Sequence, residues 1–237
     1  MERDQRVGIM RSCTVLAASV ALILAVPILA EAGTLGALGY NLEQWSFSAS
    51  AAVGFSQQDV HVKTNRDIDD EATSSRFGIK LAFAPLNWLD VYGLVGAADW
   101  RLDEGSFKGV LGTHYGGGVR LRLFPWFWEE TGIFNFDVDS QASAMSTSDD
   151  KVDAYIWEYQ WSGILSKEFQ LFTLYGGAKY VLGGVNFSPG GTGNMSPDMF
   201  WGVFIGVDYF VTPYIFFSTE LNIFTKTAIS LGVGFKY

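Results

Sequence analysis

Three observations predict that this chain is an all-β protein folded as one closed antiparallel sheet. The last nine residues alternate strictly, with apolar side chains at every second position, and this period of two is typical of a β-strand whose faces meet different surroundings. Similar segments recur along the chain. Apolar residues make up 49% of the sequence, yet no run of about 18 apolar residues follows residue 32. Because a backbone in lipid satisfies its hydrogen bonds only as a helix or a closed barrel, we predict a single antiparallel up-and-down transmembrane β-barrel of ten strands, with eight as the alternative.

The first 32 residues are typical of a secretory signal peptide. Arginines lie between Glu2 and Arg11, an apolar run extends from Thr14 to Ala30, and Ala30-Glu31-Ala32 fits the small-x-small pattern of a cleavage site. The run is short and contains a proline, which disfavours an uncleaved membrane helix. We therefore expect residues 1–32 to be removed on export and residues 33–237 to form the barrel domain.

Composition excludes several classes of function. The only cysteine, Cys13, lies inside the expected signal peptide, which excludes disulfides, thiolate metal sites and cysteine nucleophiles from the exported chain. The net charge is −9 and the basic residues form no cluster. Since phosphate binding needs concentrated Lys and Arg, we expect no nucleic-acid partner. No motif indicates a cofactor or a metal centre.

Ten alternating segments follow, each at least about as long as a spanning strand, roughly 9 to 11 residues. They are Trp45 to Ser56, Ser74 to Ala84, Leu89 to Arg101, Gly109 to Leu123, Trp126 to Val138, Ala154 to Leu165, Gln170 to Val181, Met199 to Phe210, Tyr214 to Ile223 and Thr227 to Tyr237. The connections at 85–87, 124–125, 166–168 and 211–213 are short, and the others, except 224–226, are longer. Short turns face the periplasm and long loops the exterior, so both ends of the barrel domain are expected on the periplasmic side.

Each segment in turn carries its polar residues on one face. Serines alternate with apolar residues in the first segment, and charged or imidazole side chains do so in the second to fourth and in the sixth to tenth. The expected inward residues are Ser46, Ser48, Ser50, Arg76, Lys80, Asp90, His114, Arg120, Arg122, Glu158, Lys179, Asp208, Glu220 and Lys236. An Arg or Lys facing the middle of the bilayer would cost roughly 2 to 4 kcal/mol, so the charged face is the lumen. The fifth segment is the exception, because facing Trp126, Trp128, Phe134 and Phe136 outward also turns out Glu130, which indicates a bulge or an interfacial position.

Three stretches resemble the transmembrane domain of outer-membrane protein A and its small-barrel relatives. Leu89-Asp-Val-Tyr-Gly-Leu-Val-Gly-Ala-Ala-Asp-Trp100 is similar to a Leu-Asp-Ile-Tyr strand of that family, 206–215 to the turn before its last hairpin, and 229–237 to its closing strand. The resemblance implies an outer-membrane location and a closing strand that the insertion machinery recognises, here through Leu231, Val233, Phe235 and Tyr237. The chain departs from the family in having ten segments where the family has eight strands. No peptidoglycan-binding domain follows Tyr237, so anchoring to the cell wall is not implied.

The inward charges fall into two levels, counted from the periplasmic turns. Lys80, Asp90, Arg120, Arg122, Glu129 and Asp208 are expected low, and Arg76, His114, Glu158, Lys179 and Glu220 near or above the middle. A barrel of this size is narrow enough for side chains to fill, and buried charges must be paired. We therefore expect a salt-bridged plug. A gated ion pathway in which the pairs exchange partners is the first alternative, and an interior catalytic site the second.

The two histidines raise an enzymatic alternative. His61 is close in sequence to Asp59 and to an acidic run at 67–71, while His114 is expected high on an inward face. Omptin proteases are ten-stranded barrels that use acidic residues and a histidine near the outer rim, but this chain is shorter and its segments are not expected to extend far beyond the bilayer. A Ser-His acyl hydrolase of lipopolysaccharide lacks a serine at a recognisable spacing. We expect no enzyme.

Acidic residues at 137, 139, 149, 150 and 153 could bind divalent cations that bridge lipopolysaccharide phosphates, although a solvated loop is the simpler interpretation, because no spaced ligand loop is present.

Taken together, the signal peptide, the alternating segments and the inward charges predict a small monomeric outer-membrane barrel with a structural or surface-interaction role. A narrow channel for ions or small solutes is the alternative, and an outer-rim hydrolase acting on lipopolysaccharide or peptides a lesser one. The expected partners are outer-membrane lipid, lipopolysaccharide, periplasmic chaperones and the barrel-insertion machinery.

Overall fold

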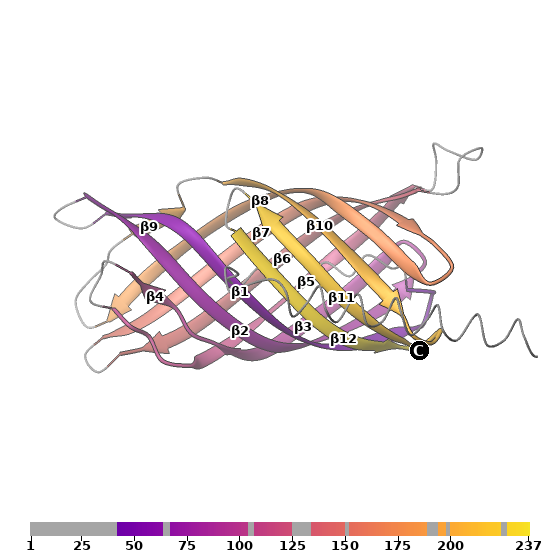
Figure 1. Cartoon of the computed structure of the whole chain (residues 1–237), viewed down its shortest axis with the longest axis horizontal. Coiled ribbons are helices and arrows are strands. Elements are labelled where there is room, and N and C mark those ends of the chain that lie inside the picture. The colour runs from indigo at the N-terminus through magenta and orange to yellow at the C-terminus, as the bar shows by residue number, and fades with distance from the viewer. Residues whose placement is uncertain are drawn as a thin grey trace, which may run out of the picture.

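The structure, a computed structural model, confirms the predicted closed barrel of ten long antiparallel strands (Figure 1). It describes residues 42–63, 67–103, 107–124, 134–149, 152–188, 194–197, 200–223 and 227–237. The long strands are β1 (Phe47–Lys63), β2 (Asp67–Leu86), β3 (Leu89–Ala98), β5 (Gly112–Phe124), β6 (Phe134–Ser148), β7 (Asp153–Glu168), β8 (Phe172–Ser188), β10 (Trp201–Phe210), β11 (Ile215–Ile223) and β12 (Thr227–Lys236). Two short strands, β4 (Arg101–Leu102) and β9 (Asn194–Pro197), lie at the end opposite the C-terminus. The expected signal peptide lies outside the described residues.

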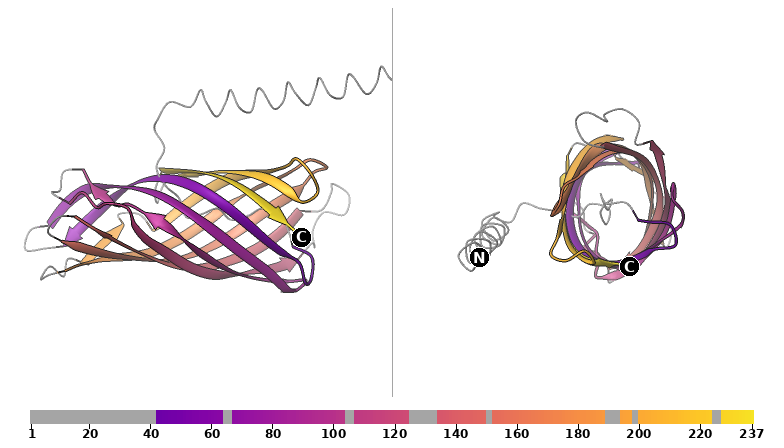
Figure 2. Two further views of the ribbon diagram at one scale, coloured as in Figure 1. Left: turned by 90° about the horizontal axis from the view of Figure 1, so that it is seen from below. Right: turned by 90° about the vertical axis from the view of Figure 1, so that its right-hand side faces the viewer.

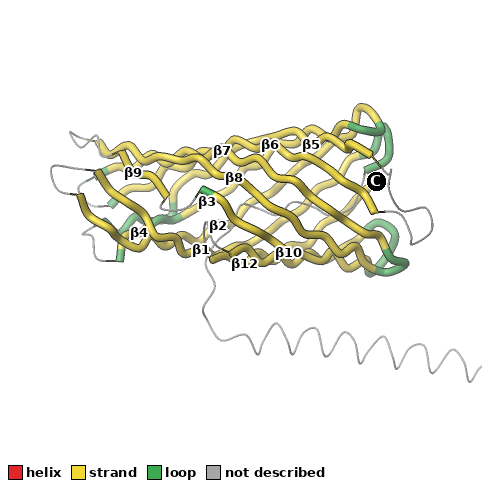
Figure 3. The backbone as a smooth tube through the Cα atoms, turned by 90° about the horizontal axis from the view of Figure 1, so that it is seen from above, coloured by secondary structure: helices red, strands yellow, loops and turns green. Residues whose placement is uncertain are grey.

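The sheet is up-and-down, because each long strand pairs with the long strands before and after it in the sequence. The ring closes where β12 pairs with β1 and β1 pairs with β2, and the end-on view in Figure 2 shows the closed wall. The strands cross the barrel obliquely (Figure 3). No helix among the described residues is long and apolar enough to cross a membrane.

The two faces of the wall differ as an alternating sequence requires. Along β10, Trp201, Val203 and Ile205 are exposed while the residues between them are buried, and most of the other long strands repeat this pattern over much of their length. The exposed outer face carries large aliphatic and aromatic side chains. A surface of this kind is costly in water and favourable in lipid. The outer face is therefore suited to a bilayer.

The closing strand aligns the two ends of the barrel. Ala49 pairs with Phe235 and Phe55 with Ile229, and the backbone amides of Phe47 and Tyr237 donate to each other's carbonyl oxygens at 2.9 and 2.8 Å. Val233, Phe235 and Tyr237 lie exposed on the outer face, and Leu231 is partly exposed. The ring of Phe47 contacts those of Phe235 and Tyr237, with centroids 5.8 and 5.7 Å apart. Aromatic side chains thus hold the seam at the end of the barrel that is expected to face the periplasm, which we call the periplasmic end; the opposite end is the outer end.

The first strand begins two residues later than predicted. Trp45 has a φ of 66°, a left-handed conformation that a strand cannot contain. Its amide donates to the Ala84 carbonyl oxygen at 2.7 Å, and the Ala84 amide donates to that of Ser46 at 3.0 Å. Leu42, just before this turn, is buried against Tyr92 and Phe216 in the periplasmic end of the lumen. The chain therefore turns out of the lumen before it enters the wall.

Several strands are longer than predicted. β1 and β2 contain 17 and 20 residues, and β7 and β8 contain 16 and 17. Beyond the bilayer a strand has no reason to alternate polar and apolar residues, although its backbone ladder continues, so the period-two signal ends before the strand does. The prediction that the strands do not extend far beyond the bilayer was therefore wrong. The omptin alternative loses that objection and keeps the other, the shorter length of this chain.

The fifth predicted segment ended too early. β6 spans Phe134–Ser148, whereas the prediction ended at Val138. Phe136 faces outward and Asp137 inward. Trp126, Trp128, Glu129 and Glu130 lie outside the described residues. The third predicted segment, extended to Arg101, ends as β3 at Ala98 and is followed by β4.

Three aromatic rings inside the barrel lie against glycines of the neighbouring strand. Tyr92 is the direct partner of Gly118, Tyr175 that of Gly206, and Phe216 that of Gly234. A β-carbon on any of these glycines would lie within 2.5 Å of the ring atoms or hydroxyl. The missing side chains thus provide the space into which the rings pack.

Candidate functional site in the barrel lumen

An ionic cluster fills the lumen side of β2, β3, β5 and β6. Arg120 donates from Nε to Asp137 Oδ2 at 2.8 Å, and Nη2 of the same guanidinium contacts that oxygen. Asp137 has no exposed surface. Arg122 lies 3.7 Å from Asp90 and donates to the backbone carbonyl oxygens of Asn87 and Leu42. Both arginines therefore bridge a carboxylate on a neighbouring strand, and Arg122 also contacts the segment that enters the lumen.

Tyr92 connects this cluster to its neighbours. Its hydroxyl lies 2.9 and 3.0 Å from the two carboxylate oxygens of Asp139 and 3.3 Å from Gln141 Oε1. Lys80 Nζ lies 3.8 Å from the centre of the Tyr92 ring, where a cation is attracted by the π face. One aromatic side chain thus joins a lysine of β2 to an aspartate of β6.

A second polar group lies on the opposite wall. Lys179 donates to Asn222 Oδ1, Asn222 donates to Glu220 Oε1 at 3.0 Å, and the Tyr175 hydroxyl donates to Glu220 Oε2 at 3.2 Å. Lys179 is 1% exposed and Asn222 is fully buried. Asp208, also fully buried, lies close enough to Tyr175 to interact electrostatically. Lys80 and Glu220 interact in the same way, so the two groups face each other across the lumen.

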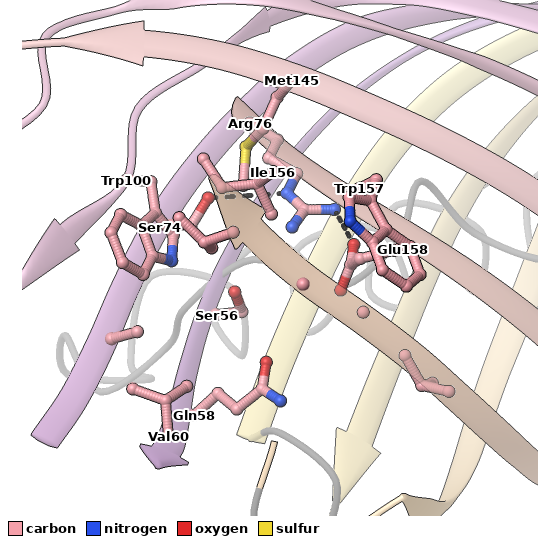
Figure 4. A pocket seen from close by; sticks show the side chains of 15 residues that line it. Ser56, Gln58, Val60, Ser74, Arg76, Trp100, Met145, Ile156, Trp157 and Glu158 are labelled. Carbon is pink, nitrogen blue, oxygen red and sulfur yellow. Dashed lines mark hydrogen bonds and ion pairs between the residues drawn. The ribbon is translucent and has the colours of Figure 1, made fainter. Parts of the chain in front are cut away.

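A third group lies nearer the outer end. Arg76 Nη1 donates to Glu158 Oε2 at 2.8 Å, and both side chains are buried (Figure 4). His114 is buried and lines one small space together with Arg76 and Glu158. The nine sequence-predicted charges of the lumen network and the His114 imidazole thus lie in or at the lumen, in three groups rather than two levels.

An apolar layer lies beyond the third group, further towards the outer end of the barrel. Trp100, Phe107 and Phe187 form a triangle of rings with centroids 5.6, 6.2 and 5.5 Å apart. Around them are buried Leu102, Met145, Ile156 and Val185. Trp100 and Phe107 belong to the connection between β3 and β5, where Leu102 and Gly109 donate backbone hydrogen bonds to Phe107 and Trp100 at 3.1 Å. We call Trp100, Phe107 and Phe187 the aromatic cap.

Sequence reasoning missed several of these residues. Asp137 and Asp139 were assigned to a possible cation-binding loop, and this was wrong, because β6 continues through them and buries both in the lumen. Their alternation with Phe136 and Val138 was the signal that would have placed them. Tyr92, Tyr175 and Asn222 were missed because, after the first segment, only charged and imidazole side chains were traced to the inner face. The aromatic cap could not be found by period, since it comes partly from a connection.

The remaining candidates for chemistry are dispersed. His61 follows buried Val60 on β1 and so lies on the outer face, whereas His114 faces the lumen. Asp149 accepts a hydrogen bond from the Val152 amide at 2.8 Å and closes the turn before Asp153, while Asp150 lies outside the described residues. Within the described ranges, no group of three or more His, Asp or Glu side chains is arranged to hold a metal ion.

These features define the class of protein. An even number of antiparallel strands, an apolar outer face and polar residues inside are the architecture of transmembrane barrels of the outer-membrane type. No protein-family profile and no curated protein sequence matches the chain.

The solved structures with a similar backbone arrangement are β-barrels. An outer-membrane channel from Pseudomonas putida F1 has a TM-score of 0.49 and 11% identity, over 86% of this chain and 100% of the other. The transport unit of the autotransporter AIDA-I from Escherichia coli has 0.39 and 14%, over 86% and 93%. Neisserial surface protein A has 0.35 and 13%, over 80% and 95%. The fold assignment rests on the strand pairing of the chain itself.

Proposed function

We propose that this protein is an integral outer-membrane barrel whose lumen is closed by its own side chains, and that it has a structural or surface-interaction role. The observation that supports this proposal is the succession of buried layers along the lumen. The Arg120–Asp137 pair and its neighbours occupy the periplasmic half, the Arg76–Glu158 pair lies further out, and the aromatic cap follows. Ions crossing this path would have to break buried pairs and then cross an apolar layer, both of which are costly.

The proposal is tested by conductance in a planar bilayer. We expect the wild-type barrel to show no discrete conductance. Replacing the cap by alanine at Trp100 and Phe107 leaves the ionic cluster in place, and replacing Arg120 and Asp137 by alanine leaves the cap in place, so neither double variant should conduct. Combining these four substitutions with Arg76→Ala and Glu158→Ala, which removes the buried pair between the two layers, should produce conductance. A matched control replaces Val110 and Leu111, which are exposed, by alanine and should stay silent.

Discrete conductance of the wild-type protein would contradict the plug and favour the alternative, a narrow channel for small ions. Under that alternative the lumen pairs line the path, so Glu158→Gln and Lys179→Met should change the ion selectivity. Folding of every variant is checked by heat-modifiable migration on a gel, which a closed barrel shows and an unfolded chain does not.

A further inference from the structure

A cavity lies in the lumen at the level of the Arg76–Glu158 pair (Figure 4). Its volume is about 40 Å³, which is room for about three water molecules. Residues of β1, β2, β6, β7 and β8 surround it together with Trp100 of the aromatic cap, so it lies inside the barrel and not on the outer face. This size restricts any occupant to a few non-hydrogen atoms.

Two buried polar groups face this cavity without a protein partner in the described part of the chain. Ser56 is 4% exposed, and its hydroxyl group makes no hydrogen bond to a described protein atom. Arg76, also 4% exposed, donates from Nη1 to Glu158 and, at 3.4 Å, from Nε to Ser74 Oγ. Figure 4 shows the third nitrogen of the guanidinium, Nη2, pointing away from both partners on the side of Ser56. Because buried polar groups in folded proteins are nearly always hydrogen-bonded, these two indicate a bound hydrogen-bonding molecule.

Polar and apolar side chains are intermingled around the cavity. Gln58 lies beside Val60. Ile156 lies between Ser74 and Arg76 (Figure 4). The polar groups are therefore kept apart from one another, and a molecule that links them must both donate and accept hydrogen bonds in several directions. Water does so, and a buried water typically makes about three hydrogen bonds.

An ion is a poor occupant of this cavity. Arg76 Nη1 and Glu158 Oε2 are 2.8 Å apart and neutralise each other. An anion bound to Arg76 would approach Glu158, and a cation bound to Glu158 would approach Arg76, so either would bring an uncompensated charge into a buried site. Water carries no net charge, and it can accept a hydrogen bond from a guanidinium while it donates one to a hydroxyl or amide oxygen.

We propose that this cavity is a water site, in which about three ordered molecules link Ser56, Gln58, Arg76 and Glu158. The layer of the lumen between the ionic cluster and the aromatic cap is then part protein and part solvent, and the waters complete the hydrogen bonding of the buried pair. The proposal goes beyond the closure of the lumen, since a plugged barrel and a narrow channel could both contain these waters. Its test therefore measures bound water and stability, which are independent of conductance.

The experiment uses the exported chain folded in detergent and labelled with ¹³C at the methionine methyl groups. Met145 lines the cavity, and Met145→Leu serves to assign its resonance. We expect nuclear Overhauser cross-peaks between the Met145 methyl group and water. The number of long-lived waters is counted by ¹⁷O relaxation dispersion, which exchanging protons do not affect.

Ser56→Ala removes one hydrogen-bonding group and adds no volume, so it should lower the number of long-lived waters by about one. Ser48→Ala is the matched control, because Ser48 is a buried serine that does not line the cavity and whose hydroxyl group has no partner among the described residues. It should leave both the Met145 cross-peak and the number of waters as in the wild type.

Two substitutions that fill the cavity from different strands distinguish bound water from a dry space. Ala72→Val on β2 and Val181→Ile on β8 should each lower the number of long-lived waters. Each should also raise the equilibrium constant of unfolding in guanidinium titrations by about tenfold, the equivalent of roughly 1.4 kcal/mol, because the buried polar groups lose their partners. In a dry cavity the added methyl groups would lower that constant. Ala142→Val, on the exposed outer face of β6, should change neither quantity.

The proposal is overturned if the wild-type Met145 methyl group shows no cross-peak with water, or if filling the cavity stabilises the barrel. It is equally overturned if the variants of Ser56, Ala72 and Val181 all keep the wild-type number of long-lived waters, since destabilisation without a loss of water would be overpacking alone. Variants are compared only when they migrate as folded barrels, and Ser56→Ala serves if neither filling variant folds.

Discussion

Tyr175 occupies the space that Gly206 leaves free. A β-carbon at position 206 would lie 2.3 to 2.7 Å from three atoms of the tyrosine ring and hydroxyl. The ring is almost completely buried and its hydroxyl is held by Glu220, so it has little freedom to move away. The packing at this position therefore depends on one pair of residues, Tyr175 and Gly206.

Gly206→Ala should therefore destabilise the barrel by about 1 to 3 kcal/mol, the usual cost of overpacking a core. In a Tyr175→Leu background the same substitution should cost less than about 0.5 kcal/mol, because the clashing ring is absent. Free energies of unfolding from guanidinium titrations in detergent give this double-mutant cycle. Gly93→Ala is the matched control, since its nearest neighbour would be 4.0 Å away. Equal costs of Gly206→Ala in both backgrounds would contradict the packing.

The buried ion pair of Asp137 and Arg120 allows a corresponding test of an electrostatic contact. Asp137→Asn keeps the shape but leaves a guanidinium buried without its main counter-ion, and breaking a buried pair in this way costs about 3 to 5 kcal/mol. Arg101 pairs with Asp99 at 3.0 Å but is 56% exposed, so Arg101→Gln should cost no more than about 1 kcal/mol. Thermal unfolding of both variants in one detergent compares them. Similar losses would mean that water reaches Arg120.

At the scale of the strand, the seam between β1 and β12 depends on the last three residues. Deleting Phe235 to Tyr237 removes the pairing of Ala49, Ser48 and Phe47 and exposes a sheet edge, which hydrocarbon does not tolerate. We expect this truncated chain to be exported but to remain unfolded in the periplasm. Lys236→Thr changes a side chain that lies against the Phe210 ring at 4.6 Å and should have little effect.

Membrane fractionation and heat-modifiable migration distinguish the two outcomes. A folded truncated barrel together with a failed Lys236→Thr variant would mean that the facing of the closing strand is reversed.

The outer ends of β1 and β2 carry acidic side chains whose mutual repulsion depends on pH. On the outer face of β2 the apolar residues end at Phe77, and Ser75, Thr73 and Glu71 continue beyond them, outside the bilayer band. Partial burial, then repulsion from Asp103, Asp59 and Asp70, raises the pKa of Glu71 above its ordinary value of 4.5. The raised pKa means that the folded state binds the Glu71 proton more tightly than the unfolded chain does. The repulsion between Glu71 and the three aspartates is therefore complete above the raised pKa and is lost as the pH falls towards 4.5.

We therefore expect amide hydrogen-exchange protection at residues 59–63 to increase as the pH is lowered through the raised pKa. Glu71→Gln should remove most of this dependence. Glu168→Gln, a change at the periplasmic end of β7, should leave it intact. Protection factors corrected for the intrinsic pH dependence of exchange are the measurement. Protection that decreases on acidification in the wild type would contradict the assignment.

At the scale of the whole molecule, the position of the bilayer decides which substitutions are tolerated. Ile205 lies near the middle of β10 and is 53% exposed, while Val110 lies beyond the outer end of β5 and is 60% exposed. Ile205→Arg should cost roughly 2 to 4 kcal/mol in lipid and Val110→Arg about 0 to 1 kcal/mol. Folding into lipid vesicles measures both. Equal costs would mean that the apolar band is not the bilayer contact.

The sequence predicted the architecture because alternation, strand number and closing strand depend on the contrast between lipid and lumen. Where that contrast ends, prediction failed. The outer parts of β1, β2 and β6 continue as strands without an apolar face. Asp137 and Asp139 lie at the other end of β6 and were missed although they alternate with Phe136 and Val138. The partners of Lys179 and Tyr92 depend on which strands adjoin and in what register, and the aromatic cap depends on how a connection folds, so neither could be derived from a single segment.

The contact between Tyr175 and Gly206 also constrains how this sequence can evolve. A side chain can replace Gly206 only after the ring opposite has become smaller, because the reverse order passes through the clash. Substitutions at the two positions should therefore occur in a fixed order along any lineage. Gly118 differs, since a β-carbon there would also lie 2.4 Å from the Ser140 carbonyl oxygen. No change at Tyr92 removes that obstacle, so Gly118 should stay glycine while the Tyr175–Gly206 pair remains free to change, one step at a time.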